Sequence, residues 1–194
     1  MPKTKQFSEQ VALVTGGGTG IGRAFAEALA TAGARVVIAS RREEILRRTA
    51  AELNQKCDAE RVFTLALDIR NRAQIDALVT DVIDRWHSLD VIINNSGLAV
   101  PETVDQITED AWDKVMETNL RGVMQLVRAA LPYMTKNDLV TSLTFHHRPA
   151  NMATRTYRRI ALQSSVCSAT RKACAIIRAR SAQTFASSIS VRGW

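Results

Sequence analysis

This sequence has few cysteines and no long apolar run. Its three cysteines, Cys57, Cys167 and Cys174, are odd in number and lack metal-ligand spacing, which argues against a disulfide framework and favours a reducing compartment. No stretch approaches the ~18 apolar residues of a membrane-spanning helix, and the opening MPKTKQFSEQ has no apolar segment behind its lysines. We therefore expect no signal peptide, no membrane span, no metal site and a cytoplasmic location.

The last part of the chain lacks acidic residues. Residues 1–138 contain 17 Lys and Arg and 19 Asp and Glu, whereas residues 139–194 contain nine basic residues and no acidic one. The net charge of +7 therefore comes from a segment that also has a single glycine, Gly193. Folded surfaces mix both signs of charge, so the break predicts a domain over 1–138 and an atypical basic tail over 139–194.

Residues 1–138 alternate between short apolar runs and segments with apolar residues at helical spacing. The apolar runs lie at residues 11–15, 35–40, 61–67 and 89–95. A long helix is expected over 108–134. This alternation is typical of βαβ units, so it predicts an α/β fold with a Rossmann-like, doubly wound parallel sheet. Past residue 138 the pattern becomes irregular, although residues 138–145 could form a fifth strand.

A glycine-rich segment, TGGGTGIG at 15–22, joins the first strand to the first helix. Glycines at that junction permit a tight turn and let backbone amides approach a phosphate, which then sits at the positive end of the helix. The alternative is a flexible turn without a ligand. Its position between strand and helix favours the phosphate.

Ser40, Arg41 and Arg42 end the second strand, where a dinucleotide fold usually offers a carboxylate to the ribose hydroxyl. Guanidinium groups suit a 2′-phosphate, so these residues predict NADP(H) in preference to NAD(H). In the alternative interpretation they begin a solvated helix and pair with Glu43 and Glu44.

Several motifs in order resemble the short-chain dehydrogenase/reductase family, over roughly residues 8–136. They are Gly16, Gly20 and Gly22 after Thr15, Asp68 past the third strand, NNSG at 94–97, and Asn119 within ETNLRGV. The resemblance implies that the glycine turn holds the pyrophosphate, Asp68 the adenine amine, and residues 95–97 the ribose, with Ser96 where the family usually has alanine. A plain helix cap is the alternative role for Asp68. The candidate cofactor residues are thus Thr15, Gly16, Thr19, Gly20, Ile21, Gly22, Ser40, Arg41, Arg42, Asp68, Ile69, Asn95, Ser96 and Gly97.

The family's catalytic signature, Tyr-x-x-x-Lys, is missing. A free tyrosine has a pKa of about 10, and in the family a lysine four residues later supplies the positive charge that lets it act, while a serine holds the substrate oxygen. Here Tyr157 is followed by Ala161, and Tyr133 by Asn137. Tyr157 lies 13 residues after Thr144 and 38 after Asn119, close to the family's intervals. The catalytic candidates are therefore Asn119, Thr144 and Tyr157. The alternative for Tyr157 is a partly exposed tyrosine without a catalytic role. The resemblance implies that Asn119 holds helix geometry and a water; its alternative is a side chain that bonds to backbone.

Two interpretations of the basic tail stay open: a disordered segment, or a gene read out of frame from near residue 137. Back-translated with a two-base shift, residues 172–186 can encode a segment resembling the helix after the family's lysine. Family members usually add strands and a helix that packs on the 108–134 helix, often across a homo-oligomer interface. Without them we expect a partly uncovered helix, low solubility or marginal stability, and a chain that need not assemble.

Three functions compete at this point. The first is an NADP-dependent oxidoreductase transferring hydride between nicotinamide and a ketone or secondary alcohol. The second is an inactive dinucleotide-binding remnant, which the missing lysine favours. The third, binding of nucleic acid by the arginine-rich tail, is the weakest because that tail has no recognition motif.

Overall fold

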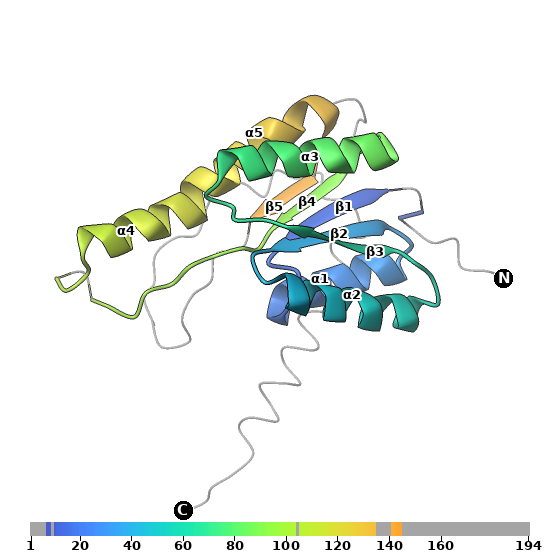
Figure 1. Cartoon of the computed structure of the whole chain (residues 1–194), viewed down its shortest axis with the longest axis horizontal. Helices are drawn as coiled ribbons and strands as arrows, with labels where there is room; N and C mark the ends of the chain where they lie inside the picture. Colours follow the sequence, from blue (N-terminus) through green and yellow to red (C-terminus); the bar gives the residue numbers. More distant parts are fainter. Residues whose placement is uncertain (1–6, 9, 104, 135–140, 145–194) are drawn as a thin grey trace, which may run out of the picture. The chain divides into compact units, whose positions relative to one another are not determined.

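The computed structural model describes residues 7–8, 10–103, 105–134 and, for the backbone, 141–144. Within them, five parallel strands form one sheet in the order β3-β2-β1-β4-β5 (Figure 1). The strands are β1 Val11–Thr15, β2 Arg35–Ser40, β3 Val62–Ala66, β4 Val91–Asn94 and β5 Thr141–Thr144. This order confirms the Rossmann-like α/β fold expected from the alternating pattern. The proposed boundary at residue 138 stays a prediction, because most of the tail lies outside the described residues.

The order in which the strands are added reverses at the centre of the sheet. Strands β2 and β3 extend to one side of β1, and β4 and β5 to the other. Parallel strands present their carboxyl ends at one edge, and the loops leaving neighbouring strands on the two sides of such a switch point diverge. The segments after β1 and β4 therefore begin next to each other at the place where this fold class binds ligands.

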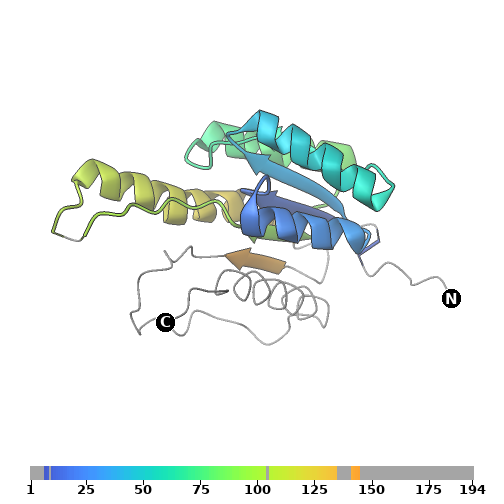
Figure 2. The same ribbon diagram turned by 90° about the horizontal axis from the view of Figure 1, so that it is seen from below.

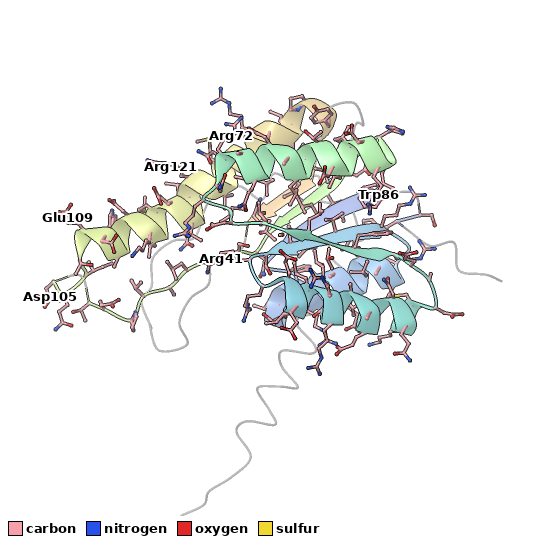
Figure 3. All side chains as sticks on the ribbon, viewed as in Figure 1. Arg41, Arg72, Trp86, Asp105, Glu109 and Arg121 are labelled. Atoms are coloured by element: carbon pink, nitrogen blue, oxygen red, sulfur yellow. The ribbon has the colours of Figure 1, made fainter. Side chains whose placement is uncertain are left out.

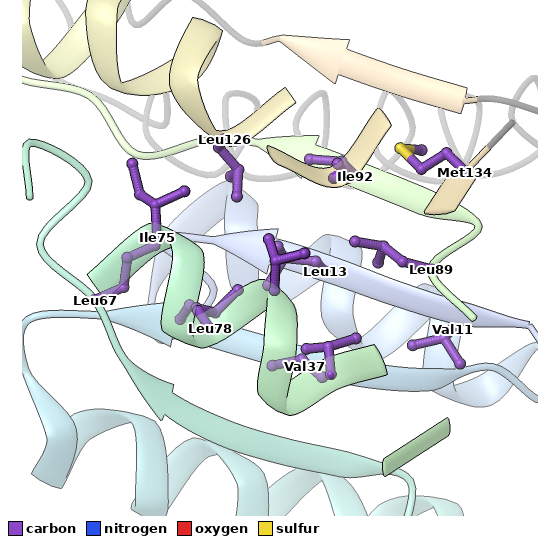
Figure 4. Packing of buried hydrophobic residues seen from close by; sticks show 14 of the residues in the cluster. Val11, Leu13, Val37, Leu67, Ile75, Leu78, Leu89, Ile92, Leu126 and Met134 are labelled. Carbon is purple, nitrogen blue, oxygen red and sulfur yellow. The ribbon is translucent and has the colours of Figure 1, made fainter. Parts of the chain in front are cut away.

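Helices cover both faces of the sheet. One face carries α1, Gly20–Thr31, and α2, Glu43–Cys57; the other carries α3, Arg72–Trp86, and α5, Gly122–Met134 (Figure 1). Alternate strand residues supply both layers, because side chains along a strand point to opposite faces. Val11 and Leu13 of β1 thus join the buried cluster under α3 and α5 (Figure 4). Burial of each large side chain contributes ~1.5–3 kcal/mol. This cluster therefore holds the central strands in place, and with them the carboxyl ends of β1 and β4, where the site lies.

The helical segment expected over 108–134 is present but interrupted. It consists of α4, Glu109–Met116, a π-helical turn η1, Glu117–Arg121, and α5, which follow one another as one rod (Figures 1 and 2). The Thr108 hydroxyl caps its start by accepting from the Ala111 amide at 3.2 Å. A π turn widens the helix and redirects its side chains, so one straight apolar stripe does not run through it. Trp112 of α4 and Leu131 of α5 are 53% and 45% exposed, whereas Leu126 and Ala130 of α5 are buried.

Among the described residues, none of the helices is both long and apolar enough to cross a bilayer.

Candidate functional site

The turn between β1 and α1 needs its glycines. Gly16 and Gly20 have φ angles of +64° and +54°, in the left-handed region. A Cβ on Gly16 would lie 2.9 Å from Asn95 Nδ2, and one on Gly22 only 2.3 Å from the Gly16 carbonyl oxygen. The backbone of the turn therefore packs against itself and against the segment after β4, with no room for side chains at these two positions.

Thr15 and Asn95 tie the ends of β1 and β4 together. The buried Thr15 hydroxyl oxygen accepts from the amides of Asn95 and Ser96, each at 3.0 Å. In return, Asn95 Nδ2 donates to the carbonyl oxygens of Thr15 and Gly16, each at 3.2 Å. On the other side of the turn, the Thr49 hydroxyl of α2 donates to the Gly18 carbonyl at 2.8 Å. The glycine turn is thus held from both flanks before any ligand binds.

The start of α1 is open toward a cavity of about 440 Å³. Thr19, the residue before the helix, makes no side-chain capping bond. A Cβ built on Gly20 would meet nothing within 4 Å, so the backbone here is uncovered. The first-turn amides of a helix lack intrahelical partners and carry its positive dipole end. A phosphate group fits this uncovered start by both space and charge.

Two arginines stand beside the glycine turn. Arg41 and Arg42 line the cavity, and Arg42 Nη2 lies 3.5 Å from the Thr19 hydroxyl oxygen, at the mouth of the turn. The alternative that they pair with the acids at the start of α2 is not what the structure has: Glu43 instead binds Arg47 at 2.6 Å. Within the described part of the chain, neither Arg41 nor Arg42 forms an ion pair. Their charges are therefore available to an anionic ligand.

Asp68, also in the cavity wall, is held by Arg70. Arg70 Nε and Nη2 donate to the two carboxylate oxygens at 3.0 and 2.6 Å, and the Arg70 amide donates to Oδ1 at 3.0 Å. These bonds, more than the distant charge of Arg41, lower the pKa of Asp68 to about 2. Asp68 is therefore ionised and can only accept hydrogen bonds at neutral pH.

The helix-cap alternative for Asp68 is wrong, because Asn71 caps α3. The Asn71 side chain accepts from the Gln74 amide at 3.2 Å, as the capping-box pattern predicts. The return bond differs, since Gln74 Oε1 accepts from the Asp68 amide at 2.7 Å rather than from Asn71. Gln74 thus fixes the backbone of Asp68 at the end of the strand.

Asn119 lies in η1 and bonds to the loop after β4. Its Oδ1 accepts from the Leu98 amide and its Nδ2 donates to the Leu98 carbonyl, both at 2.7 Å. The side-chain amide therefore acts as a backbone-like bridge between the helix and the loop that follows Gly97. The simpler alternative, an asparagine satisfied by backbone, describes this geometry.

The cavity gathers most of the predicted cofactor residues from four separate segments. Those that line it are Gly16, Thr19, Gly20, Ile21, Ser40, Arg41, Arg42, Asp68, Ile69, Asn95, Ser96 and Gly97. Thr15 and Gly22 lie beneath the turn and shape it. Sequence reasoning missed five further lining residues, which are Leu67, Arg70, Leu98, Lys114 and Thr118. Thr118 precedes Asn119 and Lys114 is one helical turn earlier, so helical spacing from Asn119 is the signal that could have found them.

The other two catalytic candidates are Thr144 and Tyr157, and no side chain of either is among the described residues. Thr144 ends β5, where its backbone is in register with Asn94 of β4. Its side chain and the whole of Tyr157 lie outside the description. The roles of Asn119, Thr144 and Tyr157 therefore stay predictions.

Comparison with known proteins agrees with the fold. Residues 10–139 match the family model described as short chain dehydrogenase. Sorbitol dehydrogenase from Cereibacter sphaeroides is 39% identical over 120 residues, which are 62% of this chain and 45% of that protein. An alcohol dehydrogenase from Thermococcus sibiricus, solved with 5-hydroxy-NADP, superposes with a TM-score of 0.65 at 30% identity, covering 68% of this chain and 56% of that one.

A further solved structure, L-sorbose reductase from Gluconobacter frateurii with NADPH and L-sorbose, has a TM-score of 0.65 and 30% identity over 69% of this chain and 51% of its own. The chain spans about half the length of the relatives it matches. The residues that match the family model include the glycine turn, the described residues that line the cavity, and Asn119. The chain belongs to the short-chain dehydrogenase/reductase family, a family of oxidoreductases.

Proposed function

We propose that this chain is an NADP(H)-dependent oxidoreductase that transfers hydride between nicotinamide and a ketone or secondary alcohol. The observation that carries the proposal is the cavity where the uncovered start of α1 meets two arginines without carboxylate partners in the described residues. When bound, the nicotinamide supplies or accepts the hydride. The residues of this chain hold the cofactor and orient it.

The adenosine half of the cofactor is assigned to the described residues. Amides at the start of α1 bind the diphosphate, Asp68 accepts from the adenine amine, and residues 95–97 contact the ribose. Arg41 and Arg42 bind the 2′-phosphate, which NAD(H) lacks. The NADP-type ligands bound in two similar structures support a nicotinamide dinucleotide at this place.

The direct test is titration of the full chain with NADPH and NADH, followed by cofactor fluorescence. We expect NADPH to bind more tightly, and Arg42→Ala to weaken NADPH by about tenfold, the worth of a charge-assisted bond, with little effect on NADH. Arg48→Ala is the matched control, because Arg48 lies in α2, the helix that Arg42 precedes, and is 83% exposed and paired with Glu52. Equal affinity for both cofactors in the wild type would contradict the assignment to NADP(H).

A second candidate, cofactor binding without turnover, is favoured by a specific feature. Ala161 stands four residues after Tyr157, where the family has lysine. Arg158 and Arg159 are adjacent to Tyr157 and would not point along with it on a helix. NADPH oxidation that depends on added ketone supports the enzyme, whereas NADPH binding without oxidation across a panel of ketones supports the second candidate.

The partners proposed are small carbonyl or alcohol compounds in the cytoplasm. Members of the family usually form homo-oligomers, but this chain need not assemble. We do not expect nucleic acid to bind. Electrophoretic mobility of a DNA duplex at two salt concentrations tests the last point, since phosphate contacts give salt-sensitive binding.

A further inference from the structure

Some charged residues of the cavity are paired with an opposite charge in the described part of the chain and others are not. Among the described residues, its wall has the cations Arg41, Arg42, Arg70 and Lys114 and one carboxylate, Asp68. Lys114 is paired with Asp110 at 2.5 Å. The Asp68 carboxylate would repel a phosphate, and it shares the cavity with the arginines proposed to bind one.

Arg70 is the main partner of that carboxylate. Its guanidinium contacts both oxygens of Asp68, and its own amide adds a third bond to Oδ1. A planar fork that meets both oxygens of a carboxylate is the strongest and most directional form of such a pair. Asp68 is also fixed from behind, where Gln74 accepts from its amide at 2.7 Å. The pair is therefore a rigid, locally neutral unit in the wall.

Arg41 is the other cation near Asp68. Its positive charge acts on Asp68 through space, and no hydrogen bond joins the two. Figure 3 shows Arg41 at the end of β2, next to the strand that leads to Asp68. If Arg70 did not hold the carboxylate, Arg41 would be the cation able to turn toward it.

We infer that Arg70 is a specificity-determining residue for the phosphorylated cofactor: by binding Asp68 it removes a negative charge from the cavity and leaves Arg41 for the 2′-phosphate. Arg70 would then raise the preference for NADPH over NADH without contacting the phosphate itself. The inference rests on the proposed function, because it needs a nicotinamide dinucleotide in this cavity.

The test measures the ratio of NADH to NADPH dissociation constants in the full-length chain. Both cofactors share adenine, so effects on adenine binding cancel in the ratio. We expect Arg70→Met to lower the ratio about tenfold, because Asp68 is then an unpaired anion that attracts Arg41. The double variant Asp68→Asn with Arg70→Met should return the ratio to near the wild-type value, since no carboxylate is left to neutralise.

A different result separates the competing explanations. If Arg70 itself binds the 2′-phosphate, the double variant keeps the low ratio, and that outcome overturns the inference. An unchanged ratio in Arg70→Met overturns it as well. Arg70→Gln repeats the measurement if the methionine variant does not fold, because glutamine removes the charge and keeps a polar side chain.

The matched control is Arg72→Met. Arg72, at the start of α3 (Figure 3), also pairs with a carboxylate, its Nε lying 2.9 and 2.8 Å from the two oxygens of Asp76, but it is not among the residues that line the cavity. The control should keep the wild-type ratio, and a drop as large as that of Arg70→Met would contradict the inference. A wild-type chain that binds neither cofactor refutes the proposed function itself, whereas a wild-type preference for NADPH that survives Arg70→Met refutes only the role of Arg70.

Discussion

Two alanine substitutions in the glycine turn separate its packing from its proposed ligand. At Gly22 a Cβ would lie 2.3 Å from the Gly16 carbonyl oxygen and 2.5 Å from Asn95 Nδ2. Both neighbours are held by the bonds that join β1 to β4, so the backbone has to shift. We expect Gly22→Ala to cost about 3 kcal/mol, in the upper range for overpacking, which corresponds to a Tm lower by about 6–12 °C for a chain of this length.

At Gly20 the balance is different. The added Cβ meets nothing within 4 Å, and only the φ of +54° opposes alanine, at a cost of about 1–2 kcal/mol. The methyl group would nevertheless stand at the uncovered start of α1, where the diphosphate is proposed to bind. We therefore expect Gly20→Ala to melt closer to the wild type than Gly22→Ala does, and yet to bind NADPH at least tenfold more weakly, roughly the worth of a lost charged contact.

Thermal melting and NADPH titration at a temperature where all three proteins are folded provide the comparison. Wild-type affinity in Gly20→Ala would refute the placement of the diphosphate at this turn. A wild-type Tm in Gly22→Ala would show that the turn has room for a side chain, contrary to the close contacts described.

Four more predictions concern other parts of the molecule. Asn119→Ala loses both bonds to Leu98 and should lower the free energy of unfolding by about 1–3 kcal/mol in urea titrations; an unchanged midpoint would contradict the bridge. Because Arg70 lowers the pKa of Asp68 from 3.8 to about 2, the stability it contributes is present above pH ~4 and lost as the pH falls toward ~2. The free energy of unfolding of the wild type should exceed that of Asp68→Asn by about 1–2 kcal/mol at pH ~5, and this difference should vanish near pH ~2. A difference in free energy that does not depend on pH would refute the pairing. Met124 and Leu131, 52% and 45% exposed on α5, should promote association, so Met124→Lys with Leu131→Lys is expected to reduce light scattering without lowering Tm, and equal scattering would argue against an exposed apolar face. Finally, the nucleotide sequence across codons 130–194 should contain a Tyr-x-x-x-Lys in another frame; its absence would refute the out-of-frame hypothesis.

The sequence alone was sufficient to predict the strands and the glycine turn between β1 and α1. Strands such as 11–15 and 35–40 were predicted with the bounds they have, because a short run rich in valine and bounded by glycine or polar residues is typical of a buried strand. The glycine turn was predicted by the same local logic, since backbone conformation and steric room are decided within a few residues.

Local periodicity was less reliable where the backbone departs from regular geometry. The 108–134 segment has a uniform apolar repeat, so nothing in it indicates the π turn at Glu117–Arg121. Similarly, Asn71 and Gln74 match a capping box, but the Gln74 side chain bonds to the Asp68 amide. Asn119 bonds to the distant Leu98, and Gln74 bonds to Asp68, which precedes the capping position; the sequence pattern contains neither bond.

The composition of the cavity was determined by the tertiary structure. The sequence by itself established that this is a Rossmann-like sheet with a glycine turn at its first strand and arginines at its second. That the arginines after β2, the Asp68–Arg70 pair and Lys114 line one cavity depended on how the segments pack. The physical reason is distance along the chain: the charges that meet in the cavity come from strands and helices tens of residues apart, and only the fold sets which of them are left for a ligand.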